Sequence, residues 1–309
     1  MLAFLFPGQG SQRVGMGLEF YRLNPSARRV FDRASEVLGY NMAELCFRGS
    51  LQTLTATENT QPAIFTCSMA ALSILQEYDV EAKMVAGHSV GEFAALVAAG
   101  SLDFTTALQT VRKRGRLMAS VQNPGAMAAI IGLTEEKVTD ICRQAEELGP
   151  VDVALFNSPT QLVISGARPA VEKAQDLARQ AGALKVTPLH VSSAFHSQLM
   201  VEIIPEWEEY VAGLNLQAPV VPVVLNTTAR VADSVTEIRQ ELVDQLTSAV
   251  RWTQSVRAMV DQGVTRTVEV GSSKILTSLN RGICQDLECF SLMNPSVVNW
   301  LAAEKQRPA

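Results

Sequence analysis

Hydrophobic and polar positions along the chain separate short apolar runs from longer amphipathic segments. The apolar runs predict the strands "LAFLF", "AKMVAG", "VPVVLN" and "TVEVG", and the amphipathic segments predict helices over 27–48, over 61–78 and directly after Ser89. Strands that alternate with helices are typical of an α/β domain with a mostly parallel sheet. The outer parts of the chain are therefore expected to form one α/β domain.

The middle of the chain has a different order of elements. In sequence these are the strand "AMAAIIGL", a helix over 134–147, the strands "VDVALF" and "QLVISG", a helix over 168–181 and the strand "ALKVTPLHV". The order βαββαβ is typical of a ferredoxin-like domain. Because the α/β pattern resumes afterwards, we predict a small ferredoxin-like domain over 125–192, inserted into a large domain of residues 1–124 and 193–309.

Charge and composition exclude several classes of protein. The 309 residues carry a net charge of −5, which argues against a broad nucleic-acid surface. No apolar run approaches the roughly 18 residues of a membrane helix, so no membrane partner is expected. The five cysteines are scattered without a CxxC pair, which predicts no metal site, no disulfide framework and a reducing, cytoplasmic location.

Ser89 lies in the pattern Gly87-His88-Ser89-Val90-Gly91, between a predicted strand and a predicted helix. This pattern in this context is typical of a nucleophile elbow, a sharp turn at which only small neighbours leave room for the backbone. The alternative is a serine that merely caps the helix. In either case the hydroxyl lies beside helix N-terminal N–H groups, which stabilise an oxyanion. Ser89 is therefore the candidate nucleophile.

A serine nucleophile needs a base, and the chain has three histidines. His88 adjoins the serine, so its side chain is expected to point away in a structural role. His190 lies in the apolar run "VTPLHV" and is expected in the core or at an interface. His196 follows among small residues, so by elimination it is the candidate base, with a surface-loop histidine as the alternative. No acid is an obvious third member, so we expect a Ser/His dyad in which a backbone carbonyl can hold the imidazole.

Arg114 belongs to the predicted helix "LDFTTALQTVRKRGRLMASV". At roughly 100° per residue, Arg114 shares an apolar stripe with Ala107, Val111 and Met118. A buried guanidinium needs an anionic partner to offset its desolvation, and no acid shares this stripe. One reading is a structural ion pair with a distant acid. The sharper reading is a clamp on a substrate carboxylate, for which malonyl is the simplest thioester-borne group.

Several motifs together resemble a known enzyme family. They are "FPGQGSQ" at 6–12, "TENTQPAIFT" at 57–66, "GHSVGE" at 87–92, "RKRGRLM" at 112–118, "FNSP" at 156–159, "AFHS" at 194–197 and "VRWTQSV" at 250–256. In this order they resemble the malonyl-CoA:acyl carrier protein transacylase family, which includes acyltransferases of polyketide synthases. The resemblance implies a hydrolase-like α/β core with a ferredoxin-like insertion.

The same resemblance implies a role for individual residues. Ser89 would carry the acyl group, His196 would act as general base and acid, and Arg114 would bind the malonyl carboxylate. The backbone N–H groups of Gln9 and Val90 would form the oxyanion hole.

Further residues are implied in positioning and selectivity. Gln245 would orient the histidine through its main-chain carbonyl. Phe195 resembles the malonyl-selective form, because its bulk would crowd an α-methyl branch. Two departures from the family pattern, "VGSSKIL" at 270–276 and Leu155, concern contacts to the carrier or the CoA tail.

The resemblance implies transfer of malonyl from malonyl-CoA to the phosphopantetheine thiol of an acyl carrier protein, without a metal or other cofactor. The partners expected of this monomer are malonyl-CoA and the carrier protein. The outward basic residues Arg112, Lys113 and Arg116 are candidates for the contact with the carrier. An acyl hydrolase on the same scaffold and a non-catalytic docking protein are the alternatives. "AFHS" and Leu155 favour a complete, freestanding polyketide acyltransferase over a fatty-acid enzyme.

Overall fold

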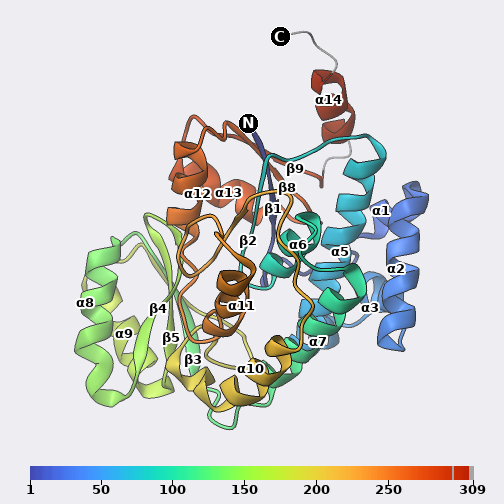
Figure 1. The fold of residues 1–309 in the computed structure, drawn as a ribbon. Helices are drawn as coiled ribbons and strands as arrows, with labels where there is room; N and C mark the ends of the chain where they lie inside the picture. The colour runs from blue at the N-terminus through green and yellow to red at the C-terminus, as the bar shows by residue number, and fades with distance from the viewer. Residues whose placement is uncertain (294–295, 306–309) are drawn as a thin grey trace. The chain divides into compact units, whose positions relative to one another are not determined.

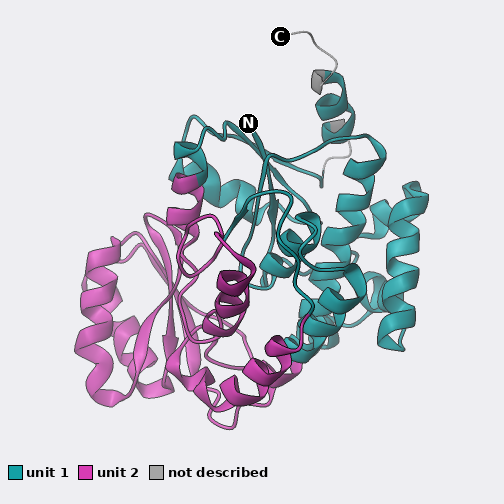
Figure 2. Cartoon of the chain, in the orientation of Figure 1, with its two compact units in different colours: residues 1–115, 215–224, 259–309 teal, residues 116–214, 225–258 magenta. Residues whose placement is uncertain are grey.

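The computed structural model describes residues 1–293 and 296–305, which group into two compact units. Unit 1 comprises residues 1–115, 215–224 and 259–309, and unit 2 comprises residues 116–214 and 225–258 (Figures 1 and 2). Each unit contains one sheet, and the two sheets differ in strand direction.

Unit 1 is built on a parallel five-stranded sheet in the order β7-β2-β1-β8-β9. Its strands are β1 (Leu2–Phe6), β2 (Met84–Gly87), β7 (Val223–Val224), β8 (Arg266–Glu269) and β9 (Glu288–Ser291). Its helices are α1 (Leu18–Leu23), α2 (Pro25–Leu38), α3 (Met42–Arg48), α4 (Leu51–Thr55), α5 (Thr57–Glu77), α6 (Gly91–Ala98), α13 (Ile275–Ile283) and α14 (Ser296–Lys305). The predicted α/β class with a mostly parallel sheet is confirmed.

The register of the parallel sheet determines which loops are neighbours. Phe6, the last residue of β1, lies opposite Gly87, the last residue of β2. Because all pairs are parallel, the loops that leave both strands start at the same edge. These loops carry Gln9 and Ser89, and ligands of open α/β sheets commonly bind at this edge.

Unit 2 contains an antiparallel four-stranded sheet in the order β4-β5-β3-β6. Its elements are β3 (Ala126–Ile131), α8 (Glu135–Ala145), the 3-10 helix η1 (Glu146–Leu148), β4 (Val151–Ser158), β5 (Gln161–Gly166), α9 (Arg168–Gln180), β6 (Lys185–Pro188), η2 (Gln198–Ile203), α10 (Ile204–Ala212) and α11 (Val235–Asp244). Apolar residues of α8 and α9 pack with the sheet into one core. The βαββαβ order predicted for a ferredoxin-like unit is confirmed.

Unit 2 is larger than the segment 125–192. A bridge joins Leu155 to Val250, and Thr253 Oγ1 donates to the carbonyl of Phe156 at 2.9 Å. These bonds attach later parts of the chain to the antiparallel sheet. Whether 125–192 forms a domain by itself therefore stays a prediction. Two of the four points where the chain passes from one unit to the other lie within helices, α7 (Phe104–Ala119) and α12 (Trp252–Asp261).

Some predicted elements differ in extent from those observed. The helix expected over 27–48 is two helices, because Gly39 takes a left-handed conformation (φ 75°) after α2 and Asn41 caps α3. The expected placement of His190 in a strand and in the core was wrong. β6 ends at Pro188, and His190 is an exposed residue beyond it.

Two structural findings concern membranes and metals. Within residues 1–293 and 296–305, no helix is long and apolar enough to cross a membrane. The same residues contain no group of three or more His, Cys, Asp or Glu side chains placed to hold a metal ion. All five cysteines are free thiols.

Candidate active site

Ser89 occupies the turn between β2 and α6. Its φ of 51° lies in the left-handed region, which a non-glycine residue adopts only when its surroundings hold it there. The helix begins with Val90 as its N-cap, and no side-chain hydrogen bond caps it. Strand β2, the turn at Ser89 and helix α6 therefore have the strand-turn-helix geometry expected of a nucleophile elbow.

Two glycines let the loop after β1 approach this elbow. A Cβ atom on Gly91 would lie 2.1 Å from the carbonyl oxygen of Phe6, and one on Gly8 would lie 2.4 Å from that of His88. Neither distance is possible for a real side chain, so only glycine fits. Gln9 directly follows Gly8 and is half-buried, with its Nε2 donating to Thr57 Oγ1 at 3.4 Å.

Arg114 projects from the buried stripe of α7, as the helical spacing predicts. Ala107, Val111 and Met118 are 0–1% exposed, and Arg114 is 1% exposed. Its Nη1 donates to Gln61 Oε1 at 3.0 Å, and its Nη2 donates to Ser89 Oγ at 3.3 Å. Unit 1 thus brings a buried cation into direct contact with the candidate nucleophile.

Electrostatics keep this arginine charged. Burial lowers the pKa of Arg114 to about 10, and the nearby Glu92 carboxylate partly opposes that shift. At neutral pH the guanidinium is still protonated. Glu92 is itself fully buried on α6, so the structural ion pair weighed from the sequence retains physical support.

The sequence reasoning did not single out Gln61 or Glu92. Gln61 lies in the quoted motif "TENTQPAIFT" on α5, and Glu92 ends the motif "GHSVGE". Both polar side chains are at most 1% exposed. A buried polar residue within an apolar helix was the available signal, because such a group requires a partner.

In unit 2, two backbone carbonyl groups hold the imidazole of His196. Nδ1 lies 2.7 Å from the carbonyl oxygen of Gln245 and 3.2 Å from that of Ser248. Because a carbonyl only accepts, Nδ1 must carry the proton, which leaves the Nε2 lone pair to act as a base. The contact with Gln245 is the one expected for this residue, and two carbonyls stand where a triad would have a carboxylate.

The turn that carries His196 is fixed by serine hydroxyls. Ser193 Oγ donates to the carbonyl of Met118 at 2.8 Å, and Ser197 Oγ donates to that of Ala194 at 2.6 Å. His196 has a left-handed φ of 56° and is 5% exposed. Phe195, the preceding residue, is also 5% exposed.

The two departures from the family pattern both make contacts within the fold. In the loop after β8, Ser272 Oγ accepts from the backbone N–H of Gly17 at 3.2 Å and from Arg13 Nη2 at 3.4 Å. Leu155 lies at an irregularity of β4 and bridges to Val250. Their part in binding the carrier or CoA stays a prediction.

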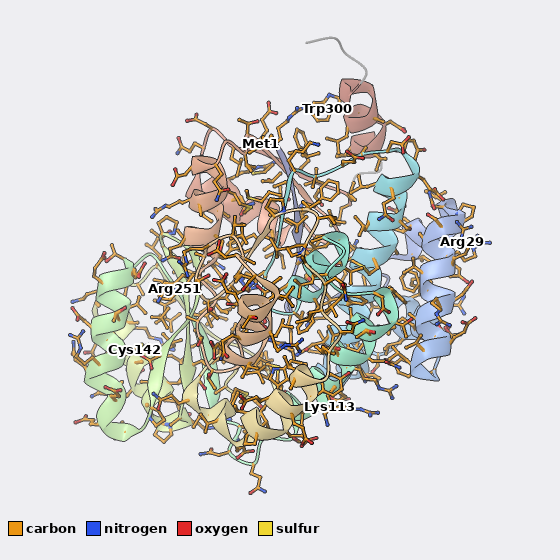
Figure 3. All side chains as sticks on the ribbon, viewed as in Figure 1. Met1, Arg29, Lys113, Cys142, Arg251 and Trp300 are labelled. Atoms are coloured by element: carbon orange, nitrogen blue, oxygen red, sulfur yellow. The ribbon has the colours of Figure 1, made fainter. Side chains whose placement is uncertain are left out.

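Of the three basic residues expected to meet a carrier, Arg112 is already engaged. Its Nη1 donates to the carbonyl of Leu38 at 2.6 Å, and its guanidinium lies 5.3 Å from the ring centroid of Tyr40. Lys113 is half-buried and is labelled on α7 in Figure 3, and Arg116 is exposed. Arg112 is thus held in a structural contact on unit 1.

Comparisons with known proteins show the family of this chain. Residues 3–289 match the family model described as the acyl transferase domain. The chain is 40% identical over 300 residues to the malonyl CoA-acyl carrier protein transacylase of Bacillus subtilis, covering 96% of this chain and 95% of that protein. It is equally 40% identical to a polyketide biosynthesis malonyl CoA-acyl carrier protein transacylase of Bacillus velezensis, covering 95% and 100%.

A solved structure gives the same result. A malonyl-transacylase solved in complex with its type II polyketide synthase acyl-carrier protein is similar to this chain with a TM-score of 0.95 at 36% identity, covering 98% of this chain and 99% of that one. A serine elbow beside a buried arginine, both in unit 1, together with the family match defines an acyltransferase. The chain belongs to the acyl transferase domain family, and its relatives include malonyl-CoA:acyl carrier protein transacylases.

Proposed function

We propose that this protein transfers a malonyl group from malonyl-CoA to the phosphopantetheine thiol of an acyl carrier protein through a malonyl-serine intermediate. The observation that carries the proposal is the 3.3 Å contact between Arg114 Nη2 and Ser89 Oγ. A guanidinium beside the acylated atom favours an acyl group that ends in a carboxylate. Malonyl has one, a single methylene from its thioester carbonyl.

In the first half-reaction Ser89 Oγ attacks the thioester carbonyl of malonyl-CoA while His196 Nε2 accepts the hydroxyl proton. The backbone N–H groups of Gln9 and Val90 stabilise the oxyanion, a donor type worth roughly 10²- to 10³-fold in rate each. When the carbon–sulfur bond breaks, His196 returns the proton to the CoA thiolate.

In the second half-reaction the same groups act in reverse. The carrier thiol gives its proton to His196 and attacks the malonyl-serine carbonyl, and Ser89 leaves as it regains the proton. Arg114 keeps the malonyl carboxylate paired throughout, and Gln245 keeps the proton on Nδ1. This cycle consumes no metal ion and no redox cofactor.

Selectivity and location complete the proposal. Phe195 excludes an α-methyl branch, which makes malonyl the preferred acyl group. A relative named for polyketide biosynthesis and one named only as a malonyl CoA-acyl carrier protein transacylase have the same 40% identity to this chain, so the proposal covers a carrier of either the fatty-acid or the polyketide type. We also propose a cytoplasmic location, where the five free thiols remain reduced.

Intact-protein mass spectrometry after incubation with malonyl-CoA tests the proposal. We expect an adduct of malonyl mass that is absent from Ser89→Ala, strongly slowed in His196→Ala, and discharged by a holo carrier protein. A Ser89→Ala variant that still forms the adduct would refute the nucleophile. Release of malonate to water at the same rate with and without the carrier would instead indicate a hydrolase.

A further inference from the structure

The carbonyls that hold His196 belong to the segment directly after α11. Gln245 is the C-cap residue of this helix, and Ser248 lies in the turn that follows. A backbone carbonyl aims at an imidazole only as well as its own segment is held in place. What anchors residues 245–251 therefore bears on the tautomer of the histidine.

Glu241 anchors this segment on one side. Its carboxylate accepts from the backbone N–H of Thr227 at 2.9 Å and from the Thr227 hydroxyl. Its own carbonyl accepts from the backbone N–H of Gln245 at 2.9 Å. One residue thus joins the last turn of α11 both to the turn around Thr227 and to the residue that holds the histidine.

The other side of the segment returns to the same turn. The backbone N–H of Arg251, labelled in Figure 3, donates to the carbonyl of Asn226 at 2.9 Å. Val250 is bonded to β4 through Ala154 and Phe156, at 2.8 and 2.9 Å. The carbonyls of Gln245 and Ser248 therefore lie in a segment that is held at both ends. Glu241 bonds one end to Thr227, and the N–H of Arg251 bonds the other end to Asn226.

A buried glutamate such as Glu241 is unusual if its only role is to connect two segments of the chain. It is 3% exposed, and the two Thr227 donors that it accepts from are neutral. Burial raises the pKa of this carboxyl, although its hydrogen bonds with Thr227 and Asn226 lower it. A buried carboxylate is costly, and an apolar side chain would fill the volume without that cost.

We propose that Glu241 is a positioning residue for His196, tying the carbonyls of Gln245 and Ser248 in the direction that keeps the proton on Nδ1. The proposal rests on the proposed role of His196 as the base. Glu241 acts through the backbone, because its carboxylate accepts from Thr227 and its carbonyl accepts from the N–H of Gln245. It supplies the orienting function that a carboxylate bonded directly to the histidine has in a triad.

The test compares three variants of the full-length protein. Glu241→Ala removes the tie, whereas Glu241→Gln retains it, since an amide can accept from the Thr227 N–H and donate to the Thr227 hydroxyl. Glu237→Ala is the matched control. Glu237 lies on the same helix and accepts a backbone N–H, that of Asp233 at 2.7 Å, but at the end away from Gln245.

Two readouts separate positioning from stability. Stopped-flow acylation by malonyl-CoA should slow by about 10- to 100-fold in Glu241→Ala, as for a small misplacement of a reacting group, and stay near the unaltered rate in the other two variants. Nitrogen NMR of the three imidazoles, assigned with His196→Ala, should show His196 losing its pure Nδ1–H tautomer in Glu241→Ala alone.

Several outcomes would overturn the inference. A folded Glu241→Ala variant with the tautomer and rate of Glu237→Ala shows that the tie does not position the histidine. A Glu241→Gln variant as slow as Glu241→Ala shows that charge, not position, matters. Should Glu241→Ala not fold, Thr227→Val removes only the hydroxyl and must shift both readouts in the same direction. Full-rate acylation by His196→Ala would instead refute the proposed base.

Discussion

Replacing Arg114 by alanine removes a guanidinium that is 1% exposed and lies 3.3 Å from Ser89 Oγ. A malonyl carboxylate entering this site would then lose its buried charge partner, which typically costs about 3–5 kcal/mol. At 1.36 kcal/mol per factor of ten, this corresponds to about 10²- to 10⁴-fold in kcat/KM for malonyl-CoA. Acetyl-CoA has no carboxylate to lose a partner, so its kcat/KM should be unchanged or higher.

The informative quantity is the ratio of kcat/KM for malonyl-CoA to that for acetyl-CoA, measured with one carrier protein. Arg114→Lys keeps the charge but not the planar fork, so its ratio should fall between those of the unaltered protein and Arg114→Ala. Arg116→Ala is the control, because Arg116 is exposed on the same helix. Circular dichroism must show that the variants fold, since Arg114→Ala leaves the buried Glu92 without its cationic neighbour.

The reasoning fails if a folded Arg114→Ala variant changes this ratio by less than about threefold, a difference well below 1.36 kcal/mol. Arg114 would then be a structural partner of Glu92 rather than a carboxylate clamp.

Two further changes probe the elbow and the acyl pocket. Gly91→Ala should lower the melting temperature, because the 2.1 Å approach of a Cβ to the Phe6 oxygen costs about 1–3 kcal/mol and outweighs the helix propensity of alanine. Gly282→Ala, with open space around it in α13, should raise the melting temperature, and a Gly91→Ala variant as stable as the unaltered protein would contradict the close approach. Phe195→Ser should increase the share of methylmalonyl adduct when the two acyl-CoAs compete, and an unchanged share in mass spectra would argue against steric selection by Phe195.

Local patterns in the sequence were sufficient for several features. The Gly-His-Ser-Val-Gly pattern predicts the turn at Ser89, because only small flanking residues permit the backbone contacts seen at Gly91. Helical spacing predicts that Arg114 faces the core, since the period of a helix fixes which side chains share a face. The βαββαβ order of unit 2 is predicted in the same way, because short apolar runs mark strands and longer amphipathic segments mark helices.

Contacts between distant segments were outside the reach of such patterns. His190 shows the limit, because an apolar run predicted a strand that ends two residues earlier. Arg114 donates to Gln61, and Thr227 donates to Glu241. Each of these hydrogen bonds joins two separate segments of the chain, and no periodicity in the sequence encodes which segments become neighbours. The sequence by itself determined the nucleophile elbow and the inward arginine. Only the tertiary structure decided what holds the arginine and the histidine in place, because each is held by groups that folding brings from another part of the chain.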